Sequence, residues 1–479
     1  MFSPVYETLV LDAGYRNWKR LYLDEFWAVQ RAHLVGLAER GIVDAATARA
    51  IGKAVDELEA AIAWPDHVPP ETEDLYFHFE RELGLKVGRE RAAFLHTARS
   101  RNDMDNTVFR LCLKKKLADF ARELLAALRD FIARARETSD DLTILFTHGQ
   151  PANVSTMGHY LSAFAGDFAQ DLRGLLNAID AVDRSTMGAC AITGTGFPLD
   201  RERVAELLGF PGMVTNTYRA ISSAHWLTKP AAAIEELLRD YTRIAADLLH
   251  KASSEVGIVS FPDALIQISS IMPQKRNPVI IEHIRIQAGL AAAASASVRE
   301  LMRNVPYQDV NEASDAPVSV LIDSLATASS ATSLLREALI NMRPNDERVR
   351  RIALDFGVTT TELADTLVRR EGVGFRDAHA ACSAFAGSGG DKVALRTAFA
   401  KTCGRELTLS DAEIEEALSP EGFVAVRKLP GGPAPEGMAP VFGELDSWAA
   451  DCAAAIAAID ARNGKARASL AEAWARIVA

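Results

Sequence analysis

The chain has 479 residues, of which 48% are hydrophobic and 24% are charged, and its formal net charge is −11. This length predicts two or three domains of an ordinary soluble protein. The acidic balance argues against nucleic-acid binding as the main function, and an anionic ligand would have to be captured by a local group of Arg and Lys side chains. The five cysteines are widely spaced and form no Cys-x-x-Cys pair, which is typical of a reduced intracellular protein.

Residues 1–4 contain no basic segment leading into an apolar stretch, so we expect no signal peptide. The most apolar run, at 288–298, is too short to cross a bilayer. The sequence therefore predicts a cytoplasmic protein.

Helical periodicity dominates the chain. A first helical unit ends near residue 100 and contains a proline-rich break at 64–70. Long stretches follow in which large apolar residues recur every three or four positions, for example Leu161, Phe164 and Phe168. These stretches are 105–137, 157–183, 230–256 and 279–304.

We therefore predict an all-α fold with three helical regions. The regions are an N-terminal domain (1–100), a central long-helix bundle (101–350) and a C-terminal domain (351–479). Long helices with apolar stripes leave more apolar surface than one copy can cover, so we also expect the chain to oligomerise.

One loop within the central region concentrates chemical groups. Residues 268–278 read Ile-Ser-Ser-Ile-Met-Pro-Gln-Lys-Arg-Asn-Pro, which places two hydroxyls, an ammonium and an amide close together. The apolar pair Ile271 and Met272 suggests a flap that packs against another surface. Pro278 suits the start of the helix that follows, and a loop that enters a helix N-terminus can hold an anion.

The loop resembles the signature of the aspartase/fumarase superfamily, Gly-Ser-Ser-x-Met-Pro-x-Lys-x-Asn, and departs from it only at Ile268. Two upstream blocks resemble the argininosuccinate lyase branch in particular: His-Thr-Ala-Arg-Ser-Arg-Asn-Asp at 96–103 and Thr-His-Gly-Gln-Pro at 147–151. Segments at 194–202 and 367–379 resemble the same branch. The resemblance implies a carbon–nitrogen lyase that reversibly eliminates fumarate from an N-substituted aspartate.

Such an elimination needs a base for a weakly acidic C–H, a grip on the neighbouring carboxylate and a proton for the leaving nitrogen. The resemblance assigns the base to Ser269, with Ser270 adjacent. A serine hydroxyl is a poor base unless cationic and backbone donors hold it as an alkoxide, with Lys275 nearby. The alternative is that both serines only cap or turn the loop.

The resemblance also assigns the remaining groups. Lys275 and Asn277 would grip the carboxylate that takes up negative charge. His148, which follows Thr147, would handle the leaving-group proton, and Glu282 would pair with it. The second carboxylate would bind at Ser100, Arg101 and Asn102. His96 and His159 match family positions but are expected to be structural.

The family also implies how the site is assembled. The blocks near 100, 148 and 270 would come from three different subunits of a homotetramer, around a core bundle of about twenty helices. We expect no metal, because the chain has no His-Glu-x-x-His or similar ligand spacing, and no cofactor. The expected partner is a small dicarboxylate or aminocarboxylate substrate.

The sequence departs from the branch where the amine part of the substrate would be recognised. The segment 216–225 carries Arg219, Ser223 and His225 in place of acids. In the segment 306–314, which would hold the distal end, Tyr307 and Asn311 stand near or in place of the usual Tyr and Gln, and a serine replaces the usual Lys.

Two substrates remain open within the lyase hypothesis. One is argininosuccinate. The other is a different N-substituted aspartate, such as the aminopolycarboxylates cleaved by ethylenediamine-disuccinate lyase, and the departures favour it. An adenylosuccinate lyase activity and a non-catalytic, crystallin-like role are the alternatives.

Overall fold

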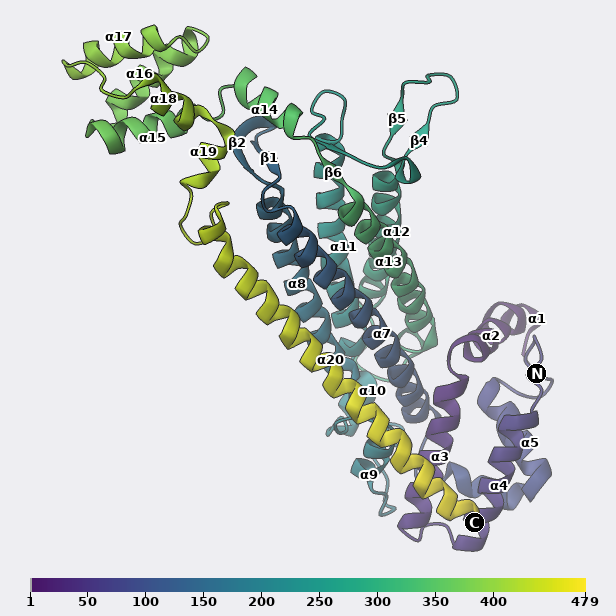
Figure 1. Ribbon diagram of the computed structural model, residues 1–479. Helices are drawn as coiled ribbons and strands as arrows, with labels where there is room; N and C mark the ends of the chain where they lie inside the picture. Colours follow the sequence, from purple (N-terminus) through teal and green to yellow (C-terminus); the bar gives the residue numbers. More distant parts are fainter. Residues whose placement is uncertain (1) are drawn as a thin grey trace.

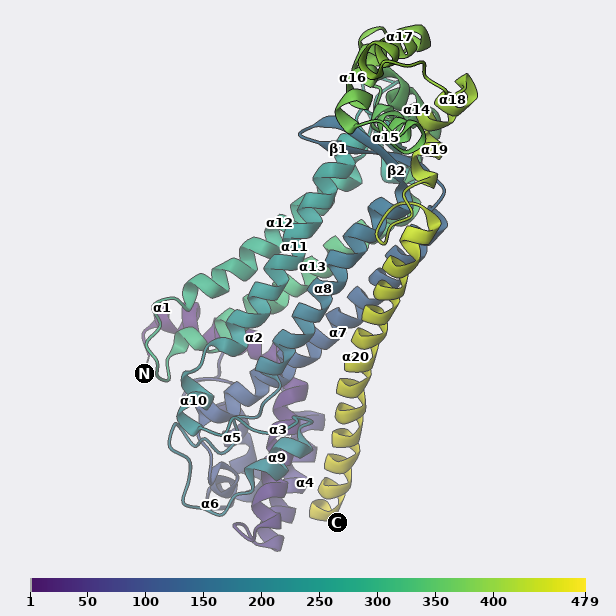
Figure 2. The ribbon, with the colours of Figure 1, turned by 90° about the vertical axis from the view of Figure 1, so that its left-hand side faces the viewer.

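The computed structural model describes residues 2–479. Most of these residues are helical and the strands are short, so the predicted all-α fold is confirmed. The longest helices lie alongside one another in an elongated bundle (Figures 1 and 2). They are α7 (Arg101–Glu137), α8 (Met157–Val182), α11 (His225–Lys251), α12 (Val279–Leu301), α13 (Asp315–Asn341) and α20 (Pro435–Val478).

Helix α7 illustrates why these segments fold as they do. Its N-terminus is fixed by a bond from the Ser100 backbone N–H to Asp103 Oδ1, at 2.7 Å. Its apolar residues form a buried stripe that includes Val108, Leu117 and Leu124. Burial of such a stripe, rather than helix propensity alone, stabilises long helices.

Helix α13 is one of the apolar helices of the bundle. The segment Asn311–Asn341 is long and apolar enough to cross a membrane by composition, yet 56% of its apolar window is buried inside the protein. It packs against α12 and α7. We therefore describe it as a core helix of the bundle.

The N-terminal helices share one hydrophobic core with the bundle instead of having a separate core. The rings of Trp18 and Tyr22 lie 5.2 and 4.9 Å from that of Phe109, a residue of α7. The helices are α1 (Pro4–Tyr6), α2 (Asp12–Leu21), α3 (Leu23–Glu39), α4 (Ala45–Ala61), α5 (Leu75–Val87) and α6 (Arg89–Ala92).

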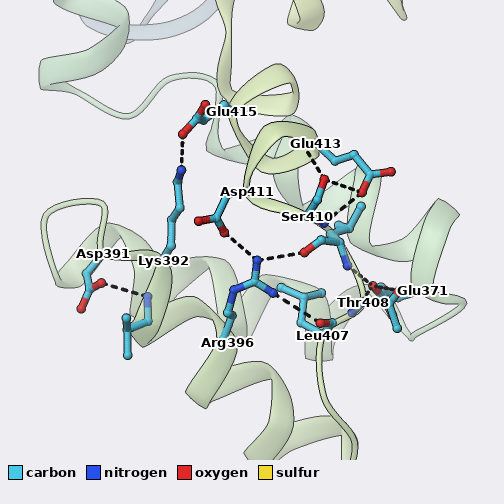
Figure 3. A network of polar contacts seen from close by, with 12 residues as sticks. Glu371, Asp391, Lys392, Arg396, Leu407, Thr408, Ser410, Asp411, Glu413 and Glu415 are labelled. Atoms are coloured by element: carbon cyan, nitrogen blue, oxygen red, sulfur yellow. Dashed lines mark hydrogen bonds and ion pairs between the residues drawn. The ribbon is translucent and has the colours of Figure 1, made fainter.

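Helices α15 (Thr360–Glu371), α16 (Phe375–Gly387), α17 (Lys392–Cys403) and α18 (Asp411–Leu418) form a small unit at one end of the bundle (Figure 1). This unit has its own core, which includes Leu367, Leu395 and Phe399. Arg396, on α17, holds the segment between α17 and α18 in place, because it pairs with Asp411 at 2.6 Å and donates to the Leu409 carbonyl at 2.9 Å (Figure 3).

The structure divides the chain differently from the expected boundary at 351. Helix α20 leaves the small unit after α19 (Pro420–Ala425) and returns along the bundle, where it contacts α7, α8, α3 and α4 (Figure 2). The other connecting helices are α9 (Arg201–Leu207), α10 (Thr217–Ser222) and α14 (Asp346–Asp355).

Within residues 2–479, three short antiparallel pairs of strands complete the fold. They are β1 (Leu142–Thr147) with β2 (Gln150–Thr156), β3 (Val259–Ser260) with β6 (Arg343–Pro344), and β4 (Gln267–Ile268) with β5 (Arg276–Asn277). The first and the third pair carry residues of the predicted site.

Candidate active site

The N-terminus of α7 opens onto a cavity of about 310 Å³, called the Arg101 cavity below. Its lining includes Ser100, Arg101, Asn102 and Asn311, four of the predicted substrate-binding residues. Asn102 Nδ2 donates to Asp309 Oδ2 at 3.0 Å, which ties the helix N-terminus to the segment predicted to hold the distal end.

Two carboxylates that were not predicted fix the Arg101 side chain. Arg101 pairs with Asp74 and lies 3.5 Å from Asp105 Oδ2, and its guanidinium stacks 5.1 Å from the Phe77 ring centroid. Burial raises the pKa of Asp105 to about 7, although Arg101 opposes this increase. The spacing of Arg101 and Asp105 is a helical neighbour pair that the sequence could have revealed, whereas Asp74 comes from a remote segment. A guanidinium held in this way at a helix N-terminus is suited to bind a substrate carboxylate.

Thr147 and His148 lie at the tip of the β1–β2 hairpin. Thr147 pairs with Gln150, so the turn contains only His148 and Gly149, with φ angles of 51° and 75°. Two central residues with positive φ are typical of a type I′ turn, which matches the twist of the flanking strands. The turn presents the exposed imidazole of His148 at the end of the hairpin.

The hairpin is anchored to the C-terminal end of α11 by Lys251, which the sequence did not point to. Lys251 is only 1% exposed, and its Nζ donates to the Ile144 carbonyl at 3.3 Å. The same ammonium lies 5.0 Å from the Phe146 ring and 4.7 Å from the Tyr160 ring. Burial lowers the pKa of Lys251, and Asp247, 3.5 Å away, acts against this decrease.

The signature loop forms a projecting flap between β4 and β5 (Figure 1). Ser269 Oγ accepts hydrogen bonds from the backbone N–H groups of Met272 at 3.1 Å and Ile271 at 3.4 Å. The Ile271 side chain is 82% exposed, so within residues 2–479 this part of the flap's apolar tip is left largely uncovered. Ser269 thus turns the loop, as the structural alternative requires, and its oxygen also has the two backbone donors that an alkoxide would need.

Lys275 and Asn277 line a cavity of about 600 Å³ between the flap and the end of α11. Asn277 Nδ2 donates to the Gln267 carbonyl at 3.1 Å, across the base of the flap. Glu282 is exposed in the first turn of α12. Within residues 2–479 no hydrogen bond or ion pair joins Glu282 to His148, so one chain does not form the predicted pair.

The predicted residues therefore fall into two groups at opposite ends of the molecule. Helix α7 is unbroken over 37 residues, which corresponds to about 55 Å. Arg101 lies at its first residue, whereas the hairpin and the flap lie beyond its other end (Figure 1). A single copy of the chain cannot bring Arg101 and Asn102 to Ser269.

Tyr307 does not line the Arg101 cavity. It lines an adjacent cavity of about 530 Å³, called the connecting cavity below, and its ring meets the ring of Tyr218 edge-on at 5.8 Å. The two segments in which the sequence departs from the argininosuccinate lyase branch thus pack against each other.

Comparisons with known proteins agree with this architecture. A family model described as "Lyase" matches residues 19–292, and one described as "Argininosuccinate lyase C-terminal" matches residues 357–425. Argininosuccinate lyase 2 of Agrobacterium fabrum is 38% identical over 94% of this chain and 92% of its own length. Argininosuccinate lyase of Methanothermobacter thermautotrophicus is 31% identical over 87% and 91%, respectively.

Among solved structures, EDDS lyase in complex with formate superposes with a TM-score of 0.85 at 25% identity, covering 99% of this chain and 96% of that chain. The family matches cover most of the chain, including both groups of site residues and the small unit. The chain belongs to the argininosuccinate lyase branch of the aspartase/fumarase superfamily.

Proposed function

We propose that this protein is a carbon–nitrogen lyase that reversibly releases fumarate from an N-substituted L-aspartate. Family membership supports the reaction class, and the residues that the chemistry requires are all present. Relatives named argininosuccinate lyase and EDDS lyase represent the two substrates that the sequence left open. With argininosuccinate the enzyme would be an amidine-lyase; with an aminopolycarboxylate it would be an ammonia-lyase-like enzyme.

In this proposal Ser269 removes the proton beside the substrate carboxylate. Its Oγ already has two backbone donors, and closure of the flap over bound substrate would exclude water and strengthen them. Lys275 and Asn277 would bind the carboxylate that takes up charge. His148, on its rigid two-residue turn, would pass a proton to the leaving nitrogen, with Glu282 as its partner.

The complete site would form between copies of the chain. The single observation that carries this proposal is the separation of about 55 Å between the two ends of α7. Antiparallel packing of copies would place the Arg101 cavity of one beside the hairpin and the flap of others. We propose a cytoplasmic homotetramer in which three subunits contribute to each site.

The test is the absorbance of fumarate during incubation of the purified oligomer with a set of N-substituted aspartates that includes argininosuccinate. We expect fumarate from at least one compound, and loss of that signal in Ser269→Ala. No fumarate from any compound, together with no consumption of fumarate when amines are supplied, would contradict the proposal.

A further inference from the structure

A second group of cationic side chains surrounds a cavity of about 300 Å³ between α7, the C-terminal end of α8 and the start of α11. We call it the cationic pocket. Its titratable lining residues are Arg110, Arg184, Arg219, His225, Lys229 and one carboxylate, Asp180. In a chain of net charge −11, such a concentration of positive charge is unexpected without a ligand.

These cations have no carboxylate partners. Within residues 2–479, neither Arg219 nor Lys229 forms an ion pair, and Arg184 only donates to the Asp183 carbonyl at 3.3 Å. Arg110 donates to the Ala181 carbonyl at 3.0 Å. The pocket therefore differs from the surface of the bundle, where arginines such as Arg136 pair with a carboxylate.

The floor of the pocket is a buried guanidinium on a buried indole. Arg110 is 2% exposed and stacks 4.9 Å from the ring centroid of Trp226, which is 1% exposed. Arg110 Nε and Trp226 Nε1 both lack a hydrogen-bond partner. Burial, with a smaller contribution from Arg219, lowers the pKa of Arg110 to about 9. A buried, unpaired charge costs free energy, and an anion in the pocket would offset this cost.

The cationic pocket adjoins the connecting cavity, which in turn adjoins the Arg101 cavity of the proposed active site. Arg219, Ser223 and His225 line both this pocket and the connecting cavity. Ala313 in turn lines both the connecting cavity and the Arg101 cavity. Three neighbouring cavities thus lie between the N-terminal end of α7 and the cations.

We infer that the cationic pocket binds an anionic group at the far end of the substrate's amine portion. This inference rests on the proposed function and narrows its substrate class to N-substituted aspartates whose amine portion ends in a carboxylate. Arg219, Ser223 and His225 are among the positions at which the sequence departs from the branch pattern. An amine portion that ends in an ammonium alone would meet like charge at Arg219 and would make no favourable contact with an anion-binding floor.

The test compares two N-substituted aspartates of equal chain length, one ending in a carboxylate and one in an ammonium, with an uncharged N-alkyl aspartate as reference. Arg219 is exposed, so Arg219→Gln should fold. Arg239→Gln is the matched control, because Arg239 is exposed on α11 and pairs with Glu236 away from these cavities. The readout is kcat/KM for fumarate release.

We expect the carboxylate-ended compound to be preferred over the ammonium-ended one by about tenfold or more, mainly through KM, as one lost charge-assisted bond would predict. Arg219→Gln should lose most of this preference, whereas Arg239→Gln should keep it. The uncharged N-alkyl compound does not reach the cations, so its kcat/KM should be the same in both variants and the wild type. Equal kcat/KM values for the two compounds, or an unchanged preference in Arg219→Gln, would overturn the inference while fumarate release still stood.

A binding measurement keeps the inference testable if no compound releases fumarate. Glutarate is titrated calorimetrically into the wild-type oligomer and into both variants. Weaker binding in Arg219→Gln alone supports an anion-binding pocket, whereas equal binding in all three overturns it. Dissociation of the Arg219→Gln oligomer would assign the cations to a contact between subunits, and would also overturn the inference.

Discussion

Ser269 Oγ lies 3.1 Å from the backbone nitrogen of Met272 and accepts its hydrogen bond. A donor at this position stabilises a serine oxygen as it becomes negatively charged, and it does so without a neighbouring histidine. The arrangement explains how an exposed loop could supply a base once the flap closes over bound substrate.

Replacement of Ser269 by alanine should therefore lower kcat by about 10²–10⁴-fold, the usual contribution of a positioned base. The melting temperature and the oligomer should not change, because the side chain bonds only to the backbone of its own loop. The control is Ser297→Ala, an exposed serine on α12 whose Oγ donates to the Ala294 carbonyl. A Ser269→Ala enzyme with a near-normal rate would place the base elsewhere.

Substitutions in the His148–Gly149 turn distinguish a catalytic role of His148 from its role in the fold. Asn adopts positive φ more readily than His, and Asn-Gly is a preferred type I′ pair, so His148→Asn should keep or raise the melting temperature. Its turnover should nevertheless fall, because an amide cannot transfer the proton. Steady-state kinetics and thermal unfolding of the same preparation test the loss of turnover and the retained melting temperature, respectively.

Gly149→Ala provides the converse variant. A side chain at a φ of 75° costs roughly 1 kcal/mol, so this variant should lose stability and misplace the hairpin tip. If His148→Asn turned over substrate normally, His148 would be only a turn residue.

The packing of helix α20 against the bundle should depend on the buried carboxylate of Asp183. Asp183 is 2% exposed, lies 2.9 Å from Lys114 Nζ and also pairs with Arg462 of α20. Asp183→Ala leaves the buried Lys114 ammonium without a carboxylate partner, so it should reduce the free energy of unfolding by about 3–5 kcal/mol. Urea denaturation measures the change.

The matched control is an exposed ion pair that also joins α20 to α7. Asp446→Ala removes the partner of Arg136, and the loss should be about 1 kcal/mol or less. An equal decrease in the free energy of unfolding in the two variants would show that burial of Asp183 adds nothing to the stabilisation by its ion pairs.

Asp105 should make stability depend on pH. Because burial raises its pKa in the folded protein to about 7, the folded state keeps this proton over a range in which the unfolded chain has lost it. The stability it provides is therefore complete below its ordinary pKa of 3.8 and is lost as the pH rises toward 7.

Asp105→Asn should remove this loss and be more stable than the wild type at pH 8, but not at low pH. It should also raise KM, because Arg101 loses one of its two carboxylate partners. Thermal unfolding across this pH range, with the exposed Asp355→Asn as control, tests the sign. A wild-type-like pH profile in Asp105→Asn would contradict it.

Periodicity predicted four bundle helices within a few residues because each buries a stripe of large apolar side chains along its length. It did not locate α20, which contains Pro440 and whose buried stripe includes many small residues, such as Ala449, Cys452 and Ala466. The hairpin of β1 and β2 was also missed, since the short apolar run at 142–147 fits a buried helix as well as a strand.

The sequence motifs pointed to the residues of the proposed site, but not to what holds them. Asp74, Lys251 and Asp309 act through tertiary contacts between segments far apart in the chain, which spacing cannot reveal. Arg110 looked like an ordinary residue of a bundle helix, and only the fold places it beside Arg219.

The central claim is that residues from different copies complete one site. It is tested most directly by mixing two inactive variants, Arg101→Gln and Ser269→Ala, after mild dissociation and reassociation, and measuring fumarate release. Random mixing of equal amounts should restore about a quarter of the wild-type rate, because about that share of sites receives its Arg101 from a Ser269→Ala copy and its Ser269 from an Arg101→Gln copy. A mixture that stays inactive, although its copies have exchanged, would contradict the claim.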